Sequence, residues 1–481
     1  MNGPASGNLG VFCSPADVRR SLAYLMPHLD SAWDRPLGAY ASQVYDVERF
    51  HTSCAARAHA MNLLRACIER AARRFGYTDE ETQRAGLEFL ASPVLQTGPH
   101  CLLLFEPDAF YTHLFSLMGL LARGREWHIT YFVSTSGFKE RAKKGPGWLP
   151  LGDEPLNLFG LPRSRMDGNS IGCLNGPYRY ALANSKGLSA PNPSAARLLA
   201  ELPNIEFPSA AEAVKMGNHA LWQRRFPSAV KLLQLDDFDV ADLIADHLED
   251  PGSWLSSHLT GKDGVASSIV DAINRLNAGP WCGWLRWTTD FFWRLEEHRV
   301  TPLRLHDGVL ESERPPRLMV RFRPDDLATA LRRRSILPSL FMAFLVTSVL
   351  PGARVLGGCR QVVYYPLMRY LASVGLQQCG DVDLLTTMLN DKRPGVWGHR
   401  VLRRAESDPF HEMEAAGGIS PLLARYAKSS LSQSSGDLAS FTTDRLWSGL
   451  AAGIANDTVT RASNEWKWSG CGSSTLLLAD R

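Results

Sequence analysis

A strand–helix–strand unit in residues 94–134 constrains the fold of this chain more than any other feature. Residues 94–97 form a short apolar run that ends at Gly98 and Pro99, which is typical of a buried strand followed by a turn. Apolar residues at helical spacing follow over 110–121, and residues 128–134 again have the composition of a strand. Because two strands joined through a helix usually lie parallel, ligand-binding groups are expected just after each strand, at 97–100 and 134–137.

A second strand-to-helix turn occurs much later in the chain. Residues 354–358 have the pattern of a strand that ends in two glycines, and residues 362–371 have that of a helix. Capped helical patterns at 14–26, 52–76 and 78–90 precede the first strand, and others fill residues 167–279 with no strand expected between them. Short strands are expected at 299–310 and 317–322, with a turn at 306–308 between them, and a buried helix at 338–350.

These patterns predict an α/β fold with a Rossmann-like parallel-sheet core, an N-terminal helical segment and an inserted helical subdomain. The length of 481 residues is enough for several such parts. The expected segments are an N-terminal helical segment (1–92), the first half of the core (93–166), the inserted helical subdomain (167–280), the second half of the core (281–375) and a C-terminal helical or irregular segment (376–481).

Charge and cysteine content exclude several classes of protein. The 52 basic residues are balanced by 49 acidic ones, so no overall field favours nucleic acid or an anionic membrane. The nine cysteines are odd in number and lack metal-ligand spacing, which argues against a disulfide scaffold or structural zinc. The first residues lack the basic and apolar parts of a secretory signal, so a cytoplasmic protein is expected. Pro338 and Pro351 interrupt the uncharged stretch 335–353, which favours a buried helix over a membrane span.

The turn after the first strand is the first candidate site. Thr97, Gly98 and His100 place a hydroxyl, a flexible residue and an imidazole at the end of a core strand, where a helix N-terminus could bind an anion. The glycine spacing matches neither a P-loop nor a dinucleotide fingerprint. The alternative is structural: Thr97 and His100 only cap the turn.

A run of cations after the second strand is the second candidate. Lys139, Arg141, Lys143 and Lys144 could bind a phosphate or carboxylate, with Trp148 as a wall beyond the Gly-Pro-Gly turn. The position of these cations just beyond a strand favours a functional role in anion binding. A solvated surface loop is the competing interpretation.

The turn at 357–361 is the third candidate. Gly357 and Gly358 allow backbone amides to approach a ligand, and Arg360 offers a bidentate fork near Gln361 and Tyr364. Cys359 at a helix start could be a nucleophile, but a small buried residue is the favoured interpretation. The histidines at 219, 247, 258, 399 and 411 lack metal-ligand spacing and are interpreted as ordinary.

Three stretches together resemble the cysteine-adding enzymes of bacillithiol biosynthesis. Residues 94–111, with Gln96-Thr97-Gly98, are similar to that family's TGQQ-type motif and the tyrosine-bearing helix after it. Residues 335–358 and 364–368 are similar to its leucine-rich helix, the strand that ends in two glycines and the next tyrosine-bearing helix. Residues 306–308 and 323–334 occupy the positions of its DG hairpin and of the helix before its LLRP-like segment. About 150 residues in blocks therefore match in order.

The resemblance implies a Rossmann-like core related to nucleotidyltransferases, which joins an amino-acid amine or thiol to a small acceptor. The chain also departs from the family. Residues 135–137 and the lysine-rich loop stand where the family has an acidic EDHD-type motif, and Pro99-His100 replaces a glutamine pair. The segment after Tyr370 is short and rich in Gly and Ser compared with the family's dimerising coiled coil. A divergent member with another substrate is therefore expected.

The leading hypothesis is a ligase or transferase-like condensing enzyme of specialised natural-product biosynthesis. It would form a C–N or C–S bond between an amino acid and an acidic or electrophilic small molecule. His100 would be the general base, with Thr97 beside it. An anion would be bound by Lys143, Lys144 and Arg360, and the glycines would hold the substrate with their backbone.

Two alternatives stay open. The first is a nucleotide-dependent transferase that adenylates its substrate with ATP or ADP as the cofactor, although no carboxylate cluster for Mg²⁺ and no other metal site is evident. The second is a non-catalytic α/β scaffold that binds a metabolite or a partner protein. Neither nucleic acid nor a membrane is an expected partner, and a homodimer is left open.

Overall fold

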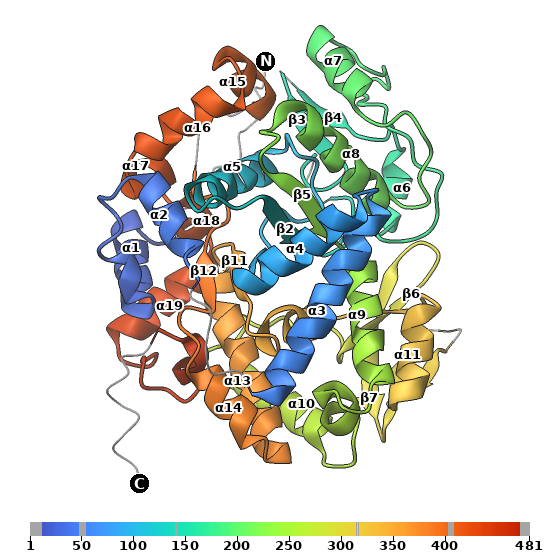
Figure 1. Cartoon of the computed structure of the whole chain (residues 1–481), viewed down its shortest axis with the longest axis vertical. Helices are drawn as coiled ribbons and strands as arrows, with labels where there is room; N and C mark the ends of the chain where they lie inside the picture. Colours follow the sequence, from blue (N-terminus) through green and yellow to red (C-terminus); the bar gives the residue numbers. More distant parts are fainter. Residues whose placement is uncertain are drawn as a thin grey trace, which may run out of the picture.

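The computed structural model describes residues 12–47, 54–139, 143–152, 154–313, 315, 317–402 and 408–471. A five-stranded parallel sheet lies at the centre, with helices around it (Figure 1). All neighbouring strands of this sheet are parallel, which confirms a mixed α/β fold and the parallel pairing expected for the strand–helix–strand unit. In spatial order the strands are β12 (Gly395–Trp397), β11 (Arg354–Gly357), β1 (Val94–Gln96), β2 (Trp127–Tyr131) and β5 (Lys231–Leu235).

The chain winds outward from β1 in both directions. It passes from β1 to β2 and β5 on one side, and later returns to the other side of β1 to form β11 and then β12. The strand order therefore reverses between β1 and β11. In open parallel sheets, ligands bind beyond the carboxyl ends of the strands at such a reversal.

Helices cover both faces of the central sheet. Helix α5 (Pro107–Ala122) follows β1 and leads to β2, and helix α13 (Gln361–Cys379) follows β11. Figure 1 shows α5 and α8 (Ala210–Arg225) above the sheet, and α9 (Asp237–Glu249) and α13 below it. Every residue of β1, β2, β11 and β12 is buried, so these strands are short, mostly apolar runs rather than alternating ones.

The helices expected before β1 are confirmed. Helix α1 (Pro15–Leu25) and helix α4 (Asp79–Ala91) begin with the predicted capping residues. Thr78 Oγ1 accepts a hydrogen bond from the Glu81 amide at 3.2 Å, and the Glu81 carboxylate accepts one from the Thr78 amide at 2.9 Å. Helix α3 (Ala55–Arg74) lies within the predicted range 52–76, whose first two residues lie outside the described part of the chain. Helix α2 (Leu37–Val44) was not predicted.

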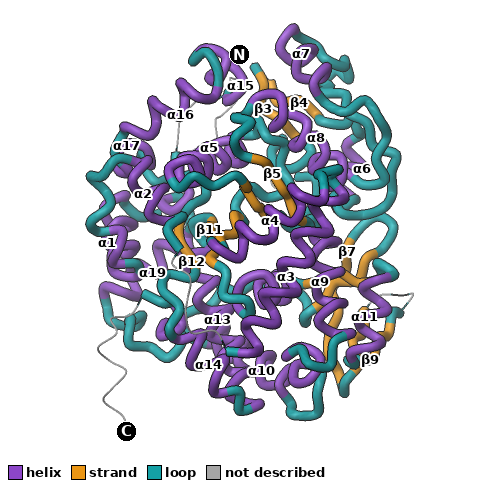
Figure 2. The backbone as a smooth tube through the Cα atoms, in the orientation of Figure 1, coloured by secondary structure: helices purple, strands orange, loops and turns teal. Residues whose placement is uncertain are grey.

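The hairpin expected around 306–308 exists, but it belongs to a second sheet. Its turn has left-handed backbone at Asp307 and Gly308, with φ of 48° and 74°, as a two-residue hairpin of matching twist requires. This sheet is antiparallel and lies beside α11 (Pro324–Arg332), apart from the central sheet (Figure 2). Its strands, in spatial order, are β10 (Ile336–Pro338), β6 (Phe292–Leu295), β7 (Val300–His306), β8 (Val309–Ser312) and β9 (Met319–Arg321).

One expectation about residues 167–279 is wrong. The pattern there predicted helices alone, yet residues 231–235 form β5, the edge strand of the central sheet next to β2. The run Lys-Leu-Leu-Gln-Leu is as compatible with a helix as with a strand, because it is too short for its apolar period to decide. Beyond β2, the chain also forms a small hairpin of β3 (Trp148–Leu151) and β4 (Glu154–Asn157).

The buried helix predicted at 338–350 is confirmed as α12 (Leu340–Phe344), which continues through a wider turn, η3 (Leu345–Val349). Among the described residues, no helix combines the length and the apolar character needed to cross a membrane. The remaining elements are η1 (Pro27–Leu29), α6 (Arg163–Gly168), α7 (Pro193–Glu201), η2 (Leu255–Leu259), α10 (Val265–Ala278), α14 (Val382–Leu389), α15 (Pro409–Ala415), α16 (Ile419–Lys428), α17 (Leu431–Ser435), α18 (Ala439–Thr442), α19 (Arg445–Ala455) and η4 (Trp466–Ser469).

Candidate active site

Three turns meet at the carboxyl end of the sheet, next to the reversal of strand order. They follow β1 at 97–100, β11 at 357–360 and β12 at 398–400. Gln96, the last residue of β1, connects them. Its Nε2 donates to Ser116 Oγ at 3.0 Å and to the Gly398 carbonyl at 3.1 Å, and its Oε1 accepts from the Gly98 amide at 2.9 Å. This buried amide therefore holds the turn after β1 against the turn after β12.

The ring of His399 lies against two of the predicted glycines. A Cβ atom on Gly98 would lie 2.5 Å from His399 Nδ1, and one on Gly358 would lie 3.1 Å from His399 Cδ2. Neither glycine has a left-handed backbone, so space and not the φ angle favours glycine here: a methyl group would clash with the ring at Gly98 and would press against it at Gly358. The His399 amide also donates to the Gly357 carbonyl at 3.1 Å.

His399 is half-buried and neutral. Burial, together with the nearby His100 and Lys144, lowers its pKa from 6.5 to about 3. The His100 ring is exposed, and its centroid lies 5.8 Å from that of His399. His399 Nδ1 lies 2.7 Å from the Thr112 hydroxyl, and Nε2 makes no hydrogen bond with the described residues. The site therefore contains a neutral imidazole with one ring nitrogen available.

Gln361 connects the turns after β1 and β11. Its Oε1 lies 2.8 Å from Thr97 Oγ1 and accepts a hydrogen bond from the Tyr364 hydroxyl at 3.1 Å. Its side chain lies on Gly357, where a Cβ atom would be 1.9 Å from the amide carbon. Among the described residues, no acceptor reaches the buried Gln361 Nε2. The structure thus brings together Thr97, Gly357, Gln361 and Tyr364, as the sequence predicts.

Lys144 is the lysine of the predicted loop that approaches His399. Its Nζ pairs with Asp108 Oδ2 at 3.2 Å, and the other oxygen of this carboxylate pairs with Arg400. Asp108 lies in the first turn of α5, so its charge joins the lysine loop, α5 and the turn after β12.

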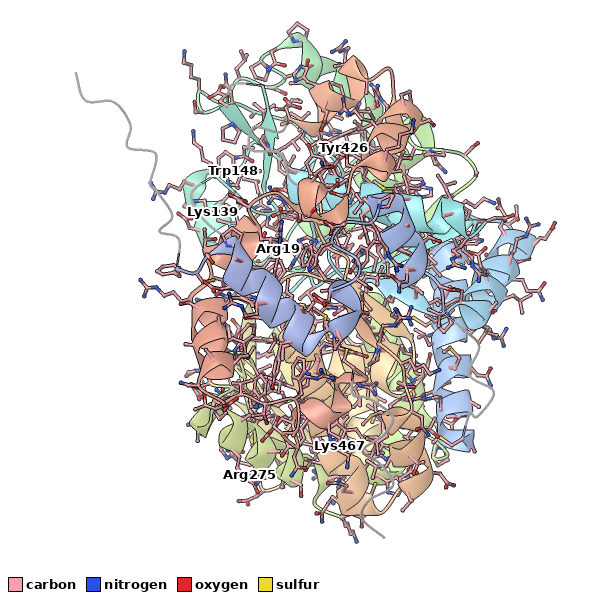
Figure 3. All side chains as sticks on the ribbon, turned by 90° about the vertical axis from the view of Figure 1, so that its left-hand side faces the viewer. Arg19, Lys139, Trp148, Arg275, Tyr426 and Lys467 are labelled. Carbon is pink, nitrogen blue, oxygen red and sulfur yellow. The ribbon has the colours of Figure 1, made fainter. Side chains whose placement is uncertain are left out.

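The other members of this loop lie elsewhere. Lys139 pairs with Asp167 of α6, so its charge is already balanced, and Lys143 is exposed. Trp148 begins β3 and is half-buried, and Figure 3 shows Lys139 and Trp148 near the same edge of the molecule. Arg141 lies outside the described residues.

Arg360 has a different role from the one expected. Its Nε and Nη2 donate to the two carboxylate oxygens of Asp444 at 2.6 and 3.2 Å, so the bidentate fork binds the start of α19 and not an external anion. Burial, together with the Asp444 charge, raises the pKa of Cys359 to about 12. Cys359 is thus a thiol and not a thiolate at neutral pH, as the small-residue interpretation requires.

The expected ligand groups after β2 are bound within the protein. The amide and hydroxyl of Ser134 donate to Asp237 Oδ2 at 2.7 and 2.9 Å, and the Tyr131 hydroxyl donates to Oδ1 at 2.6 Å. Burial raises the pKa of Asp237 to about 6, although these hydrogen bonds oppose the shift. The polar groups at this half of the sheet edge are therefore hydrogen-bonded to one another within the protein.

The cavity found at the opposite end of the sheet is far smaller than a substrate. It has a volume of about 20 Å³ and lies between α4 and the first residues of β2, lined by Glu88 and Trp127 among others, and it has room for about one water molecule. In the part of the chain that the structure describes, no group of three His, Cys, Asp or Glu residues is placed to hold a metal ion.

The sequence interpretation missed His399, because it judged histidines by metal-ligand spacing alone. A signal was present: residues 396–399 run Val-Trp-Gly-His, an apolar strand followed by glycine and histidine, as residues 95–100 do. Thr112 and Asp108 were also missed, and nothing in their local sequence distinguishes them from ordinary helix residues.

Comparison of the sequence with models of protein families gives no match, and a search of curated proteins finds no similar one.

Proposed function

We propose that this protein is a ligase-like condensing enzyme that joins an amino acid, through its amine or thiol, to an acceptor of small size. We further propose that it is a divergent relative of the cysteine-adding enzymes of bacillithiol biosynthesis with a Rossmann-like core. The strand order supports such a core, because the five strands numbered along the chain lie in the order 3-2-1-4-5.

The observation that carries the proposal is the position of His399 against Gly98 and Gly358. Three strand ends contribute to one point, where a neutral imidazole lies beside the first turn of α13. In the reaction, an amine or thiol proton passes to His399 Nε2 while the new C–N or C–S bond forms. The bond from the acceptor carbon to its leaving group breaks, and the leaving group departs with the electron pair.

This proposal changes the role first expected of His100. His399 is the better candidate for the proton acceptor because of its position: its ring lies against Gly98 and Gly358, whereas the neighbouring His100 is exposed. Lys144, which pairs with Asp108, is the cation of the predicted loop that lowers the pKa of His399. It supports recognition of an acidic acceptor.

We also propose a cytoplasmic location and small-molecule partners. Among the described residues, which include all nine cysteines, no disulfide bond is formed, in keeping with a reducing compartment.

The test pairs amino acids with activated, electrophilic or dicarboxylic acceptors, with and without ATP, and detects condensed products by mass spectrometry. We expect His399→Asn to lower the rate of product formation by about 10²-fold or more, as loss of a general base does. His306→Asn, at the exposed end of β7, is the matched control and should retain the wild-type rate.

Full turnover by His399→Asn would contradict the proposal. Product formed only with ATP, with release of pyrophosphate, would favour the adenylating transferase. A thermal-shift screen covers the scaffold alternative, since a ligand at 100 times its Kd stabilises the folded state by about 2.7 kcal/mol. Binding without any turnover would favour that alternative.

A further inference from the structure

The hydroxyl of Thr112 lies at the centre of a group of hydrogen bonds beside His399. Thr112 is fully buried on α5. Its Oγ1 lies 2.6 Å from the Asp108 carbonyl oxygen and 2.7 Å from His399 Nδ1, and it accepts from the Arg400 amide at 2.9 Å. Three groups thus share one hydroxyl, and the number of protons limits how their hydrogen bonds can be arranged.

The proton count determines which nitrogen of His399 carries hydrogen. A carbonyl oxygen can only accept, so the single Thr112 proton must lie on the bond to Asp108. The Arg400 amide supplies its own proton to Oγ1. If Thr112 donated to His399 instead, two oxygen atoms would lie 2.6 Å apart with no proton between them. His399 Nδ1 must therefore be the donor to Thr112.

We infer that Thr112 is a positioning residue that holds His399 in the Nδ1–H tautomer, so that Nε2 accepts a hydrogen bond from an N–H, S–H or O–H group of the substrate. The substrate role rests on the proposed function, whereas the tautomer follows from the hydrogen bonds alone. A carboxylate or phosphate oxygen is excluded at this point, because two lone pairs would face each other.

Burial and the charged groups around His399 keep its ring neutral. Lys144 and His100 act on it from two loops and favour the uncharged ring. Asp108 could favour the charged ring, but its carboxylate is already paired with Lys144 and Arg400.

His113, the neighbour of Thr112 on α5, completes these surroundings. It is buried next to His128 at 3.0 Å, and burial lowers its pKa to about 3, so it brings no positive charge near neutral pH. The tautomer and not the charge of His399 thus decides what the site accepts.

The tautomer can be measured without any substrate. Long-range ¹H–¹⁵N correlation spectra of the full chain labelled with ¹⁵N-histidine distinguish a protonated ring nitrogen from a bare one, and the His399→Gln variant assigns the signal. We expect Nδ1 protonated and Nε2 bare in the wild type. Thr112→Val should shift the proton toward Nε2, and Thr112→Ser should restore the wild-type spectrum.

A matched control is available on α14. Thr387 makes the same bond to a backbone carbonyl four residues earlier, at 2.7 Å from Asp383 O, with no histidine in the arrangement. Thr387→Val should leave the His399 signal unchanged. Should the wild type carry its proton on Nε2, or should Thr112→Val leave the tautomer as it was, the inference is overturned. Neither measurement requires turnover. Failure of this inference can therefore be told apart from failure of the proposed function, which full activity of His399→Asn would reveal.

Discussion

At the scale of single residues, Gly98 matters because of what lies next to it. Its backbone is one that alanine can adopt, but a methyl group there would meet His399 Nδ1 at 2.5 Å. We expect Gly98→Ala to lower the free energy of unfolding by about 1–3 kcal/mol, the usual cost of overpacking, and to displace the His399 ring. Denaturant unfolding followed by fluorescence measures the change.

Two controls separate this clash from a general glycine effect. Gly449 lies inside α19 with open space around its Cα, so Gly449→Ala should raise the free energy of unfolding by about 0.5–1 kcal/mol. In a His399→Ala background, the cost of Gly98→Ala should largely disappear. If the cost persists there, contact with His399 is not its cause.

Several members of this site could be predicted from sequence because their signals are local. Thr97 and Gly98 follow an apolar run, and the Gly357–Gly358 pair follows another. Arg360 illustrates the limit of this reasoning. Its position at a strand end suggested anion binding, but a carboxylate 84 residues later in the chain, Asp444, already binds its guanidinium. Local sequence does not contain a partner that the fold brings from so far away.

At the scale of elements, one buried carboxylate connects α3, α13 and the segment before β12. Asp391 accepts from Arg57 at 2.5 and 3.0 Å and from Arg369 at 3.0 Å, and all three side chains are almost fully buried. Asp391→Asn would leave two buried guanidinium groups without their counter-charge. We expect a loss of about 3–5 kcal/mol in the free energy of unfolding, measured by denaturant titration.

The exposed Asp34 provides the comparison for that variant. Asp34→Asn should change the free energy of unfolding by no more than about 0.5 kcal/mol, as surface substitutions usually do. Equal effects of the two substitutions would show that the buried ion pairs of Asp391 do not stabilise the packing of α3 against α13.

Helices were predicted better than strands for a physical reason. Each of α1 and α4 carries its own capping box, so the beginning of the helix is encoded within four residues. The strand β12 is three residues long, Gly-Val-Trp, and is stabilised mainly by pairing with β11 and by burial. Because neither its length nor its composition distinguishes it from a loop, the strand that positions His399 could not be recognised.

At the scale of the whole molecule, the strand order was beyond local patterns as well. The sequence predicted that β1, β2 and β11 belong to a parallel sheet, and they do. It did not separate the antiparallel strands of residues 292–338 from that sheet, because strands this short do not show by their apolar pattern which sheet they join. The position of the candidate site between β1 and β11 depends on this order and not on any single motif.

The whole molecule should also lose stability in acid, because several histidines are buried in the neutral form. Burial lowers the pKa of His113 and of His247 to about 3, and that of His128 well below 6.5. Between pH 6.5 and 3 the unfolded chain therefore binds more protons than the folded one. Each such histidine contributes stability that is complete above pH 6.5 and falls by about 1.4 kcal/mol per pH unit below it.

His247 on α9 allows this dependence to be measured. Its Nδ1 lies 2.7 Å from Ser253 Oγ and its ring is buried, so His247→Gln removes one titrating group from the interior. We expect the free energy of unfolding of this variant to fall less steeply from pH 6.5 to 4.5 than that of the wild type, by about 1.4 kcal/mol per pH unit. Denaturant titrations at several pH values give both slopes, and His306→Gln, which changes an exposed ring, should keep the wild-type slope.

Asp237 contributes a pH dependence of stability opposite in sign to that of the histidines. The comparison of the two slopes removes this contribution. Its raised pKa, about 6, means that the folded chain binds the extra proton between pH 3.8 and 6. The stability that it contributes is complete below pH 3.8 and is lost as the pH rises through 6. The contribution of Asp237 is the same in wild type and His247→Gln, so it cancels in the difference between their slopes. Parallel slopes for these two proteins would therefore mean that His247 already takes up its proton in the folded state near pH 6.5, which its burial on α9 should prevent.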